Sequence, residues 1–72
     1  MRNTHQQPIR RAGLTVWIDY AHANKPVLWS DGEFDDYGHE ITHATPYQSA
    51  DMPRDQGAAW EMINDWLSHQ QG

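Results

Sequence analysis

The stretch LTVWIDY, residues 14–20, sets the fold class of this chain. Its large apolar residues recur at every second position, which is the period of a strand with one buried face, and β-branched residues occupy its middle. The residues on the face that we expect to be buried are Leu14, Val16, Ile18 and Tyr20. Trp17 lies on the opposite face, so this strand is predicted to carry a partly exposed tryptophan.

Turn-forming residues divide the next part of the chain into shorter extended segments. Residues 27–30 predict a second strand that pairs with the first. The dipeptide DG at 31–32 is typical of a two-residue hairpin turn, because glycine adopts positive φ without strain. With such a turn, Trp29 would face Phe34 in a third strand. Residues 39–47 are compatible with either strand or loop.

The C-terminal segment predicts an amphipathic helix over residues 53–69. Pro53 suits a first helical turn, and Asp51 or Ser49 can cap it. Apolar residues then recur at spacings of three and four, namely Ala59, Trp60, Met62, Ile63, Trp66 and Leu67. The predicted fold class is therefore α+β, a small antiparallel sheet of two or three strands packed against one C-terminal helix.

The length of 72 residues is enough for one small core, so we expect residues 14–72 to form a single small α+β domain. Residues 1–13, MRNTHQQPIRRAG, have no hydrophobic period and predict a flexible basic arm. The chain has no cysteine, which excludes disulfides and thiolate metal sites. It also lacks an apolar run of roughly 20 residues and the hydrophobic region of a signal peptide, so we expect a cytoplasmic protein that binds no membrane.

Charge is distributed unevenly along the chain. All ten acidic residues follow residue 13, where only Lys25 and Arg54 oppose them. A surface of this kind repels phosphate backbones and attracts basic proteins. We therefore expect a basic protein partner, for example a nucleic-acid-binding protein, and no direct binding of nucleic acid by the domain.

Half of the acidic residues fall within residues 31–40, with no lysine or arginine among them. Such a run usually keeps a turn solvated, but it can also imitate phosphates and engage the basic residues of a partner. The candidate partner-binding residues are Asp31, Glu33, Asp35 and Asp36, with Trp17 and Trp29 as aromatic anchors. In size and charge the chain resembles phage-encoded inhibitors of host proteins, so we expect a regulator or inhibitor without enzymatic activity.

The segment HEITH, residues 39–43, fits the pattern H-E-x-x-H and resembles the zinc-binding signature of the zincin metallopeptidases. That resemblance implies His39 and His43 as zinc ligands on a helix, with Glu40 as the general base. A minimal zinc-binding protein or metallohydrolase is therefore the alternative function. However, two β-branched residues inside the motif and Pro46 after it favour an extended chain. Histidines four residues apart in a strand lie about 13 Å from each other, too far to share one ion, so we expect neither metal nor cofactor.

Two further expectations concern the tryptophans and the arm. Four tryptophans exceed what so small a core can bury fully, and a homodimer would supply cover for an exposed one. As a third possibility, Arg2, Arg10 and Arg11 would contact phosphates while the acidic domain faces a protein.

Overall fold

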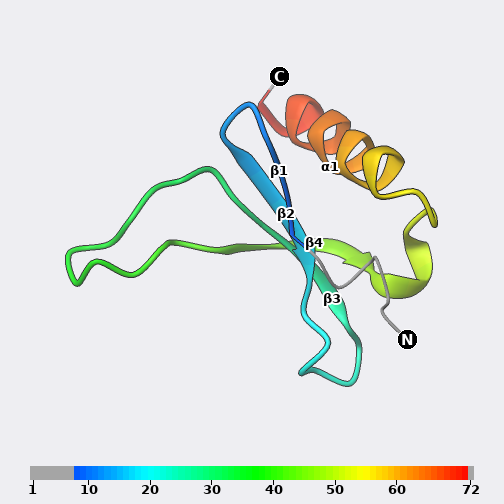
Figure 1. Ribbon diagram of the computed structural model, residues 1–72, viewed down its shortest axis with the longest axis horizontal. Helices are drawn as coiled ribbons and strands as arrows, with labels where there is room; N and C mark the ends of the chain where they lie inside the picture. The colour runs from blue at the N-terminus through cyan, green and yellow to red at the C-terminus, as the bar shows by residue number, and fades with distance from the viewer. Residues whose placement is uncertain (1–7, 72) are drawn as a thin grey trace.

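The computed structural model describes residues 8–71, and within this range the chain forms one four-stranded sheet and one α-helix (Figure 1). The strands are antiparallel and lie side by side in chain order: β1 (Ile9–Arg11), β2 (Leu14–Ile18), β3 (Pro26–Ser30) and β4 (His43–Gln48). A short 3-10 helix, Ser49–Asp51, leads toward the helix α1, Gln56–Gln71. The predicted α+β class is confirmed, but the sheet has four strands instead of two or three.

The additional strand, β1, lies in the segment predicted as a flexible arm. It pairs with β2 so that Ile9 is opposite Val16 and packs against the core. Ala12 and Gly13 form the connection with φ values of 51° and 81°, and positive φ at both central residues is what a type I′ hairpin turn requires. The structure therefore differs from the prediction at residues 9–11, while residues 1–7 of the predicted arm lie outside the described residues.

The pairing of β2 with β3 is confirmed, and its register defines the two faces of the sheet. Val16 lies opposite Trp29, and Ile18 lies opposite Val27, which places these residues on the face toward α1. Trp17 alternates to the other face.

The two-residue turn predicted at residues 31–32 is wrong. β3 pairs with β4, so that Trp29 is opposite His43, and residues 31–42 form a long loop between the two strands. Gly32 does adopt a φ of 88°, but Asp31 does not have the positive φ that a type I′ turn needs at its first central residue. β4 is an outer strand of the sheet and contains Pro46, which cannot donate a backbone hydrogen bond.

The helix α1 begins later than predicted, at Gln56 instead of residue 53, and ends at Gln71 instead of residue 69. Its start is set by Asp55, whose carboxylate accepts a 3.3 Å hydrogen bond from the Gly57 N–H, as a capping residue does. Asp51, one of the caps predicted for α1, instead accepts a 2.8 Å bond from the Gln48 N–H at the short 3-10 helix.

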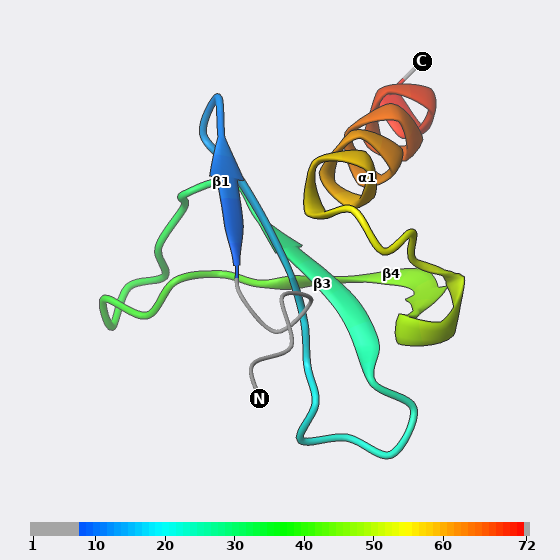
Figure 2. The same ribbon diagram turned by 45° about the vertical axis from the view of Figure 1, so that its right-hand side comes forward.

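The core lies between α1 and one face of the sheet (Figures 1 and 2). Its buried hydrophobic residues are Leu14, Val16, Ile18, Val27, Ala59, Trp60 and Ile63. Trp66 is only half-buried and meets the ring of Tyr47 edge-on, with 6.2 Å between the ring centroids. Among the described residues, no helix combines the length and the apolar character needed to cross a membrane.

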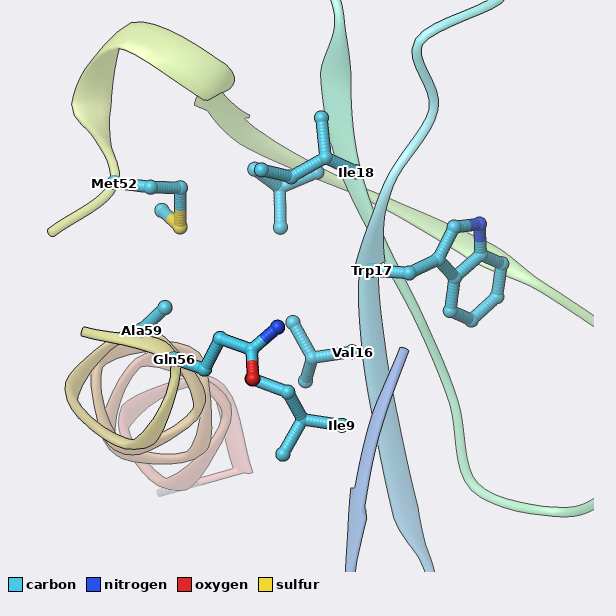
Figure 3. A pocket seen from close by; sticks show the side chains of 8 residues that line it. Ile9, Val16, Trp17, Ile18, Met52, Gln56 and Ala59 are labelled. Atoms are coloured by element: carbon cyan, nitrogen blue, oxygen red, sulfur yellow. The ribbon is translucent and has the colours of Figure 1, made fainter. Parts of the chain in front are cut away.

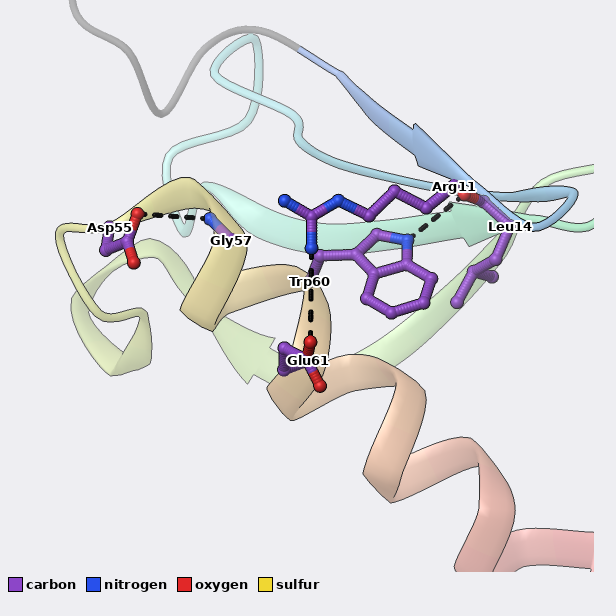
Figure 4. Close-up of polar contacts among 6 residues, drawn as sticks. All are labelled: Arg11, Leu14, Asp55, Gly57, Trp60 and Glu61. Carbon is purple, nitrogen blue, oxygen red and sulfur yellow. Dashed lines mark hydrogen bonds and ion pairs between the residues drawn. The ribbon is translucent and has the colours of Figure 1, made fainter.

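Trp60 joins α1 to the first hairpin, which consists of β1 and β2 (Figure 4). Its indole Nε1–H donates a buried 3.2 Å hydrogen bond to the Leu14 carbonyl oxygen. The Arg11 guanidinium lies 5.5 Å from the centre of the Trp60 ring, at the distance of a cation–π contact. Arg11 also comes within 4.0 Å of the Glu61 carboxylate. The side chain of a residue predicted to be mobile thus contacts the helix.

A small apolar cavity remains between β2, Met52 and the first turn of α1 (Figure 3). Its volume is about 20 Å³, and Ile9, Val16 and Ala59 are among the residues that line it. The side-chain Nε2 of Gln56 is buried there and has no hydrogen-bond partner among the described residues. The core therefore contains an amide donor in a largely hydrocarbon environment.

Candidate protein-binding loop

The acidic loop, residues 31–42, is a hairpin held together by its own backbone. Ile41 N–H donates to the Glu33 carbonyl oxygen at 2.8 Å, and Asp35 N–H donates to the His39 carbonyl oxygen at 2.9 Å. The returning side of the loop runs in line with β4, and the loop projects away from α1 (Figures 1 and 2). It is therefore an ordered projection from the domain.

The tip of the acidic loop is a turn that one carboxylate stabilises. Asp35 Oδ1 accepts hydrogen bonds of 2.9 Å from both the Tyr37 N–H and the His39 N–H. Gly38 N–H donates to the Asp35 carbonyl oxygen at 3.1 Å, and Gly38 has a φ of 83°, which glycine adopts more easily than any other residue. Asp35 therefore has a structural role at the tip.

A second side-chain contact closes the base of the loop. Ser30, at the end of β3, is fully buried, and its hydroxyl donates a 2.7 Å hydrogen bond to Glu40 Oε2. The same Ser30 oxygen accepts a 3.3 Å bond from the Gly32 N–H. Ser30 and Glu40 thus link the two sides of the loop where it leaves the sheet.

Two large aromatic side chains are exposed on the acidic loop. The exposed fraction is 62% for Phe34 and 84% for Tyr37, and no other large hydrophobic residue between 8 and 71 is exposed to this degree. A stable fold gains nothing from exposing two rings, whereas aromatic rings are enriched at the energetic centres of protein interfaces.

The acidic residues of the loop differ in whether their carboxylates accept hydrogen bonds from within the domain. Asp35 and Glu40 accept the bonds described above, and Asp31 Oδ1 accepts a long bond of 3.4 Å from the Glu33 N–H. The carboxylates of Glu33 and Asp36 form neither a hydrogen bond nor an ion pair with any described residue. Glu33 directly precedes Phe34 and Asp36 directly precedes Tyr37, so each carboxylate lies next to an exposed ring in the sequence and is available to a cation of another molecule.

The two tryptophans predicted as anchors lie on opposite faces of the sheet. Trp17 is half-buried, and its indole points to the side of β2 away from the core (Figure 3). Trp29 lies on the core side and stacks on His43, with 4.4 Å between the ring centroids and 26° between the ring planes. The structure therefore does not bring them together, and cover for Trp17 by a second copy of the chain stays a prediction.

The exposed rings were missed because the sequence was interpreted with the chain reversing at residues 31–32. That interpretation pairs Phe34 with Trp29 inside a sheet, where its ring would be covered. A second turn signal, DDYG at residues 35–38, marks the actual reversal. With the reversal at residues 35–38, Phe34 and Tyr37 lie on a projecting hairpin.

The HEITH segment is not helical. Residues 39–42 belong to the acidic loop, and His43 begins β4. The three side chains of the motif have separate contacts: His39 Nδ1 lies 3.9 Å from Asp35 Oδ2, Glu40 bonds to Ser30, and His43 stacks on Trp29. Within residues 8–71, no three potential ligands among histidines and acids gather closely enough to hold a metal ion.

The basic residues predicted to contact phosphates are also separated. Arg11 lies over Trp60, and Arg10 occupies the neighbouring position of β1, whose alternation places it on the other face of the sheet. Arg2 lies outside the described residues.

No protein-family model matches this chain, and neither a curated protein nor a solved structure shows significant similarity to it. Within residues 8–71, the acidic loop combines exposed aromatic rings with two carboxylates that have no partner there.

Proposed function

We propose that this chain is a non-enzymatic binding module whose acidic loop engages a basic surface of another protein. The observation that supports this most strongly is the combination at the loop tip. Phe34 and Tyr37 are exposed, and the carboxylates of Glu33 and Asp36 have no partner among the described residues. The hairpin bonds hold these four side chains on one short projection.

The two kinds of side chain have different roles in the proposed complex. Negative charge accelerates the encounter with a basic surface and disfavours acidic partners, and it does so less at high salt. Affinity comes mainly from the rings. Full burial removes about 150–250 Å² of an aromatic side chain from water, which at about 25 cal/mol per Å² gives at most roughly 4–6 kcal/mol per ring before the cost of association.

Order in the loop favours binding further. A loop that is already held in one conformation loses less conformational entropy when a partner binds than a disordered segment does. The Asp35 bonds at the tip and the Ser30–Glu40 bond at the base supply this order.

The overall charge of the domain favours a basic protein over a nucleic acid. The described residues include all ten acids of the chain, and the lysines and arginines opposing them are Arg10, Arg11, Lys25 and Arg54. A partner that uses a basic groove to bind nucleic acid would be blocked when the acidic loop occupies that groove. In this case the module acts as an inhibitor or regulator.

The test uses immobilised chain and two fractions of a bacterial lysate, one retained on heparin and one not. Captured proteins are identified, purified and measured for association rate at low and high salt. We expect capture from the heparin-binding fraction and an association rate that falls by at least tenfold as salt rises.

Three double variants assign the binding to the loop. Glu33→Lys with Asp36→Lys should slow association, and Phe34→Ser with Tyr37→Ser should mainly speed dissociation. The control changes net charge by a similar amount on exposed positions of α1, Asp65→Lys with Gln70→Lys, and should affect binding much less. No capture from the basic fraction, or equal losses in the loop and helix charge variants, would overturn the proposal.

A further inference from the structure

A groove opens beside the base of the acidic loop, between the sheet and the second half of α1. Its volume is about 220 Å³, many times the roughly 10–15 Å³ that a cavity needs to hold one water molecule. Six residues line it: Leu14, Trp29, Asp31, Asn64, Leu67 and Ser68.

The lining combines an apolar surface with hydrogen-bonding groups and a single charge. Leu14, Trp29 and Leu67 supply hydrocarbon and an indole, while Asn64 and Ser68 supply an amide and a hydroxyl. The charged residue of the lining is Asp31, which is exposed and whose carboxylate accepts, among the described residues, only the long bond from Glu33 N–H. No lysine or arginine lines the groove.

We infer that this groove holds one arginine or lysine side chain of the partner protein. Both side chains have a long aliphatic stem that packs on apolar surface and a cationic end that requires an acceptor. In the groove, Leu14, Trp29 and Leu67 would contact the stem, and the Asp31 carboxylate would pair with the cation. The inference rests on the proposed function of the acidic loop and names the chemical group that this function recognises.

The position of the groove connects it to the loop. Asp31 is the first residue of the acidic loop and also part of the groove lining, so a basic surface that covers the base of the loop covers the groove as well. Trp29 lies in the preceding strand and is held against His43, which fixes one wall before binding. A fixed aromatic wall beside a carboxylate is the kind of pocket in which an interface hot-spot residue is found.

The binding test titrates uniformly ¹⁵N-labelled protein with N-acetyl-arginine amide, N-acetyl-lysine amide and N-acetyl-citrulline amide, followed by NMR. Citrulline keeps the shape of arginine and lacks its charge. We expect saturable shifts of the Trp29 indole N–H and the Asn64 side-chain amide with one or both cationic probes, and at least tenfold weaker binding of citrulline. Shifts that do not saturate, that occur away from the groove, or that are equal for citrulline would overturn the inference.

Two helix variants locate the cation site. Asn64→Lys introduces an ammonium into the groove, where it competes for Asp31, and should reduce probe affinity at least tenfold. Gln70→Lys makes the same charge change at another exposed position of α1 and should leave probe affinity within twofold. Equal probe affinity in both variants would overturn the inference.

The same variants separate failure of the groove from failure of the proposed function. Phe34→Ser with Tyr37→Ser should lose the partner protein and keep probe binding. If Asn64→Lys keeps full affinity for the captured partner while the loop variant loses it, the groove inference fails and the proposed function stands. If the probes bind the groove but no basic protein is captured, the proposed function fails.

Discussion

Replacement of Gln56 by methionine is expected to stabilise this protein. Gln56 begins α1, and its Nε2 is buried beside the apolar cavity with no partner among the described residues. A buried donor without a partner costs about 1–3 kcal/mol, and methionine has a similar length, no donor and a similar helix propensity. Gln56→Met should therefore raise the free energy of unfolding by about 1–2 kcal/mol.

An increase in the free energy of unfolding is a stringent test, because most substitutions lower it. The measurement is urea denaturation followed by tryptophan fluorescence, with the denaturant slope expected to stay constant. Thermal unfolding should show a Tm increase of at least about 4 °C, since 1 kcal/mol corresponds to roughly 4–8 °C in a domain of this size.

The matched control is Gln70→Met on the exposed side of the same helix, which should change stability by less than about 0.5 kcal/mol. If Gln56→Met leaves stability unchanged or lowers it while the control behaves as expected, the unpartnered amide is not a source of instability.

Three other predictions follow from the fold. Trp60→Phe removes the indole hydrogen bond to Leu14 and should lower the free energy of unfolding by about 1 kcal/mol more than Trp66→Phe does. Trp66 is the control because its ring donates no hydrogen bond to a described residue, and urea denaturation of both variants measures the difference. Gly38→Ala should weaken the tip of the acidic loop by about 1 kcal/mol, because alanine must adopt positive φ there, and faster amide exchange of residues 35–39 with an unchanged core would show it. Because residues 39–43 are not helical, the purified protein should contain less than stoichiometric zinc, and EDTA should leave its Tm unchanged. A lower Tm in EDTA would contradict the non-helical geometry of this segment.

Sequence periodicity predicted the parts of the fold that are long enough to show it. The alternation at residues 14–18 and the apolar stripe of α1 both extend over several residues, and each fixes one buried face. β1 was missed because three residues are too few to display a period, and its strand character depends on pairing with β2. Propensity alone therefore cannot detect it.

Turn and cap positions were predicted less well, because several residues offered the same local chemistry. Asp51 and Asp55 are both suitable caps, and only the path of the chain after β4 decides that Asp55 caps α1. In the same way, DG at residues 31–32 and DDYG at residues 35–38 are both turn signals. The acidic run was visible in the sequence, whereas exposure of the aromatic rings depended on which turn reverses the chain.

The bonds that shape the acidic loop lie almost entirely within it, and Ser30 with Glu40 closes its base against the sheet. Residues 33–39 can therefore mutate without removing a side chain from the hydrophobic core. A lineage that carries this domain could acquire new binding targets by changing the projecting residues while selection on the scaffold continues unchanged. The exposed side chains at the loop tip that we propose for binding and the side chains of the hydrophobic core are therefore separate sets of positions, which can evolve at different rates.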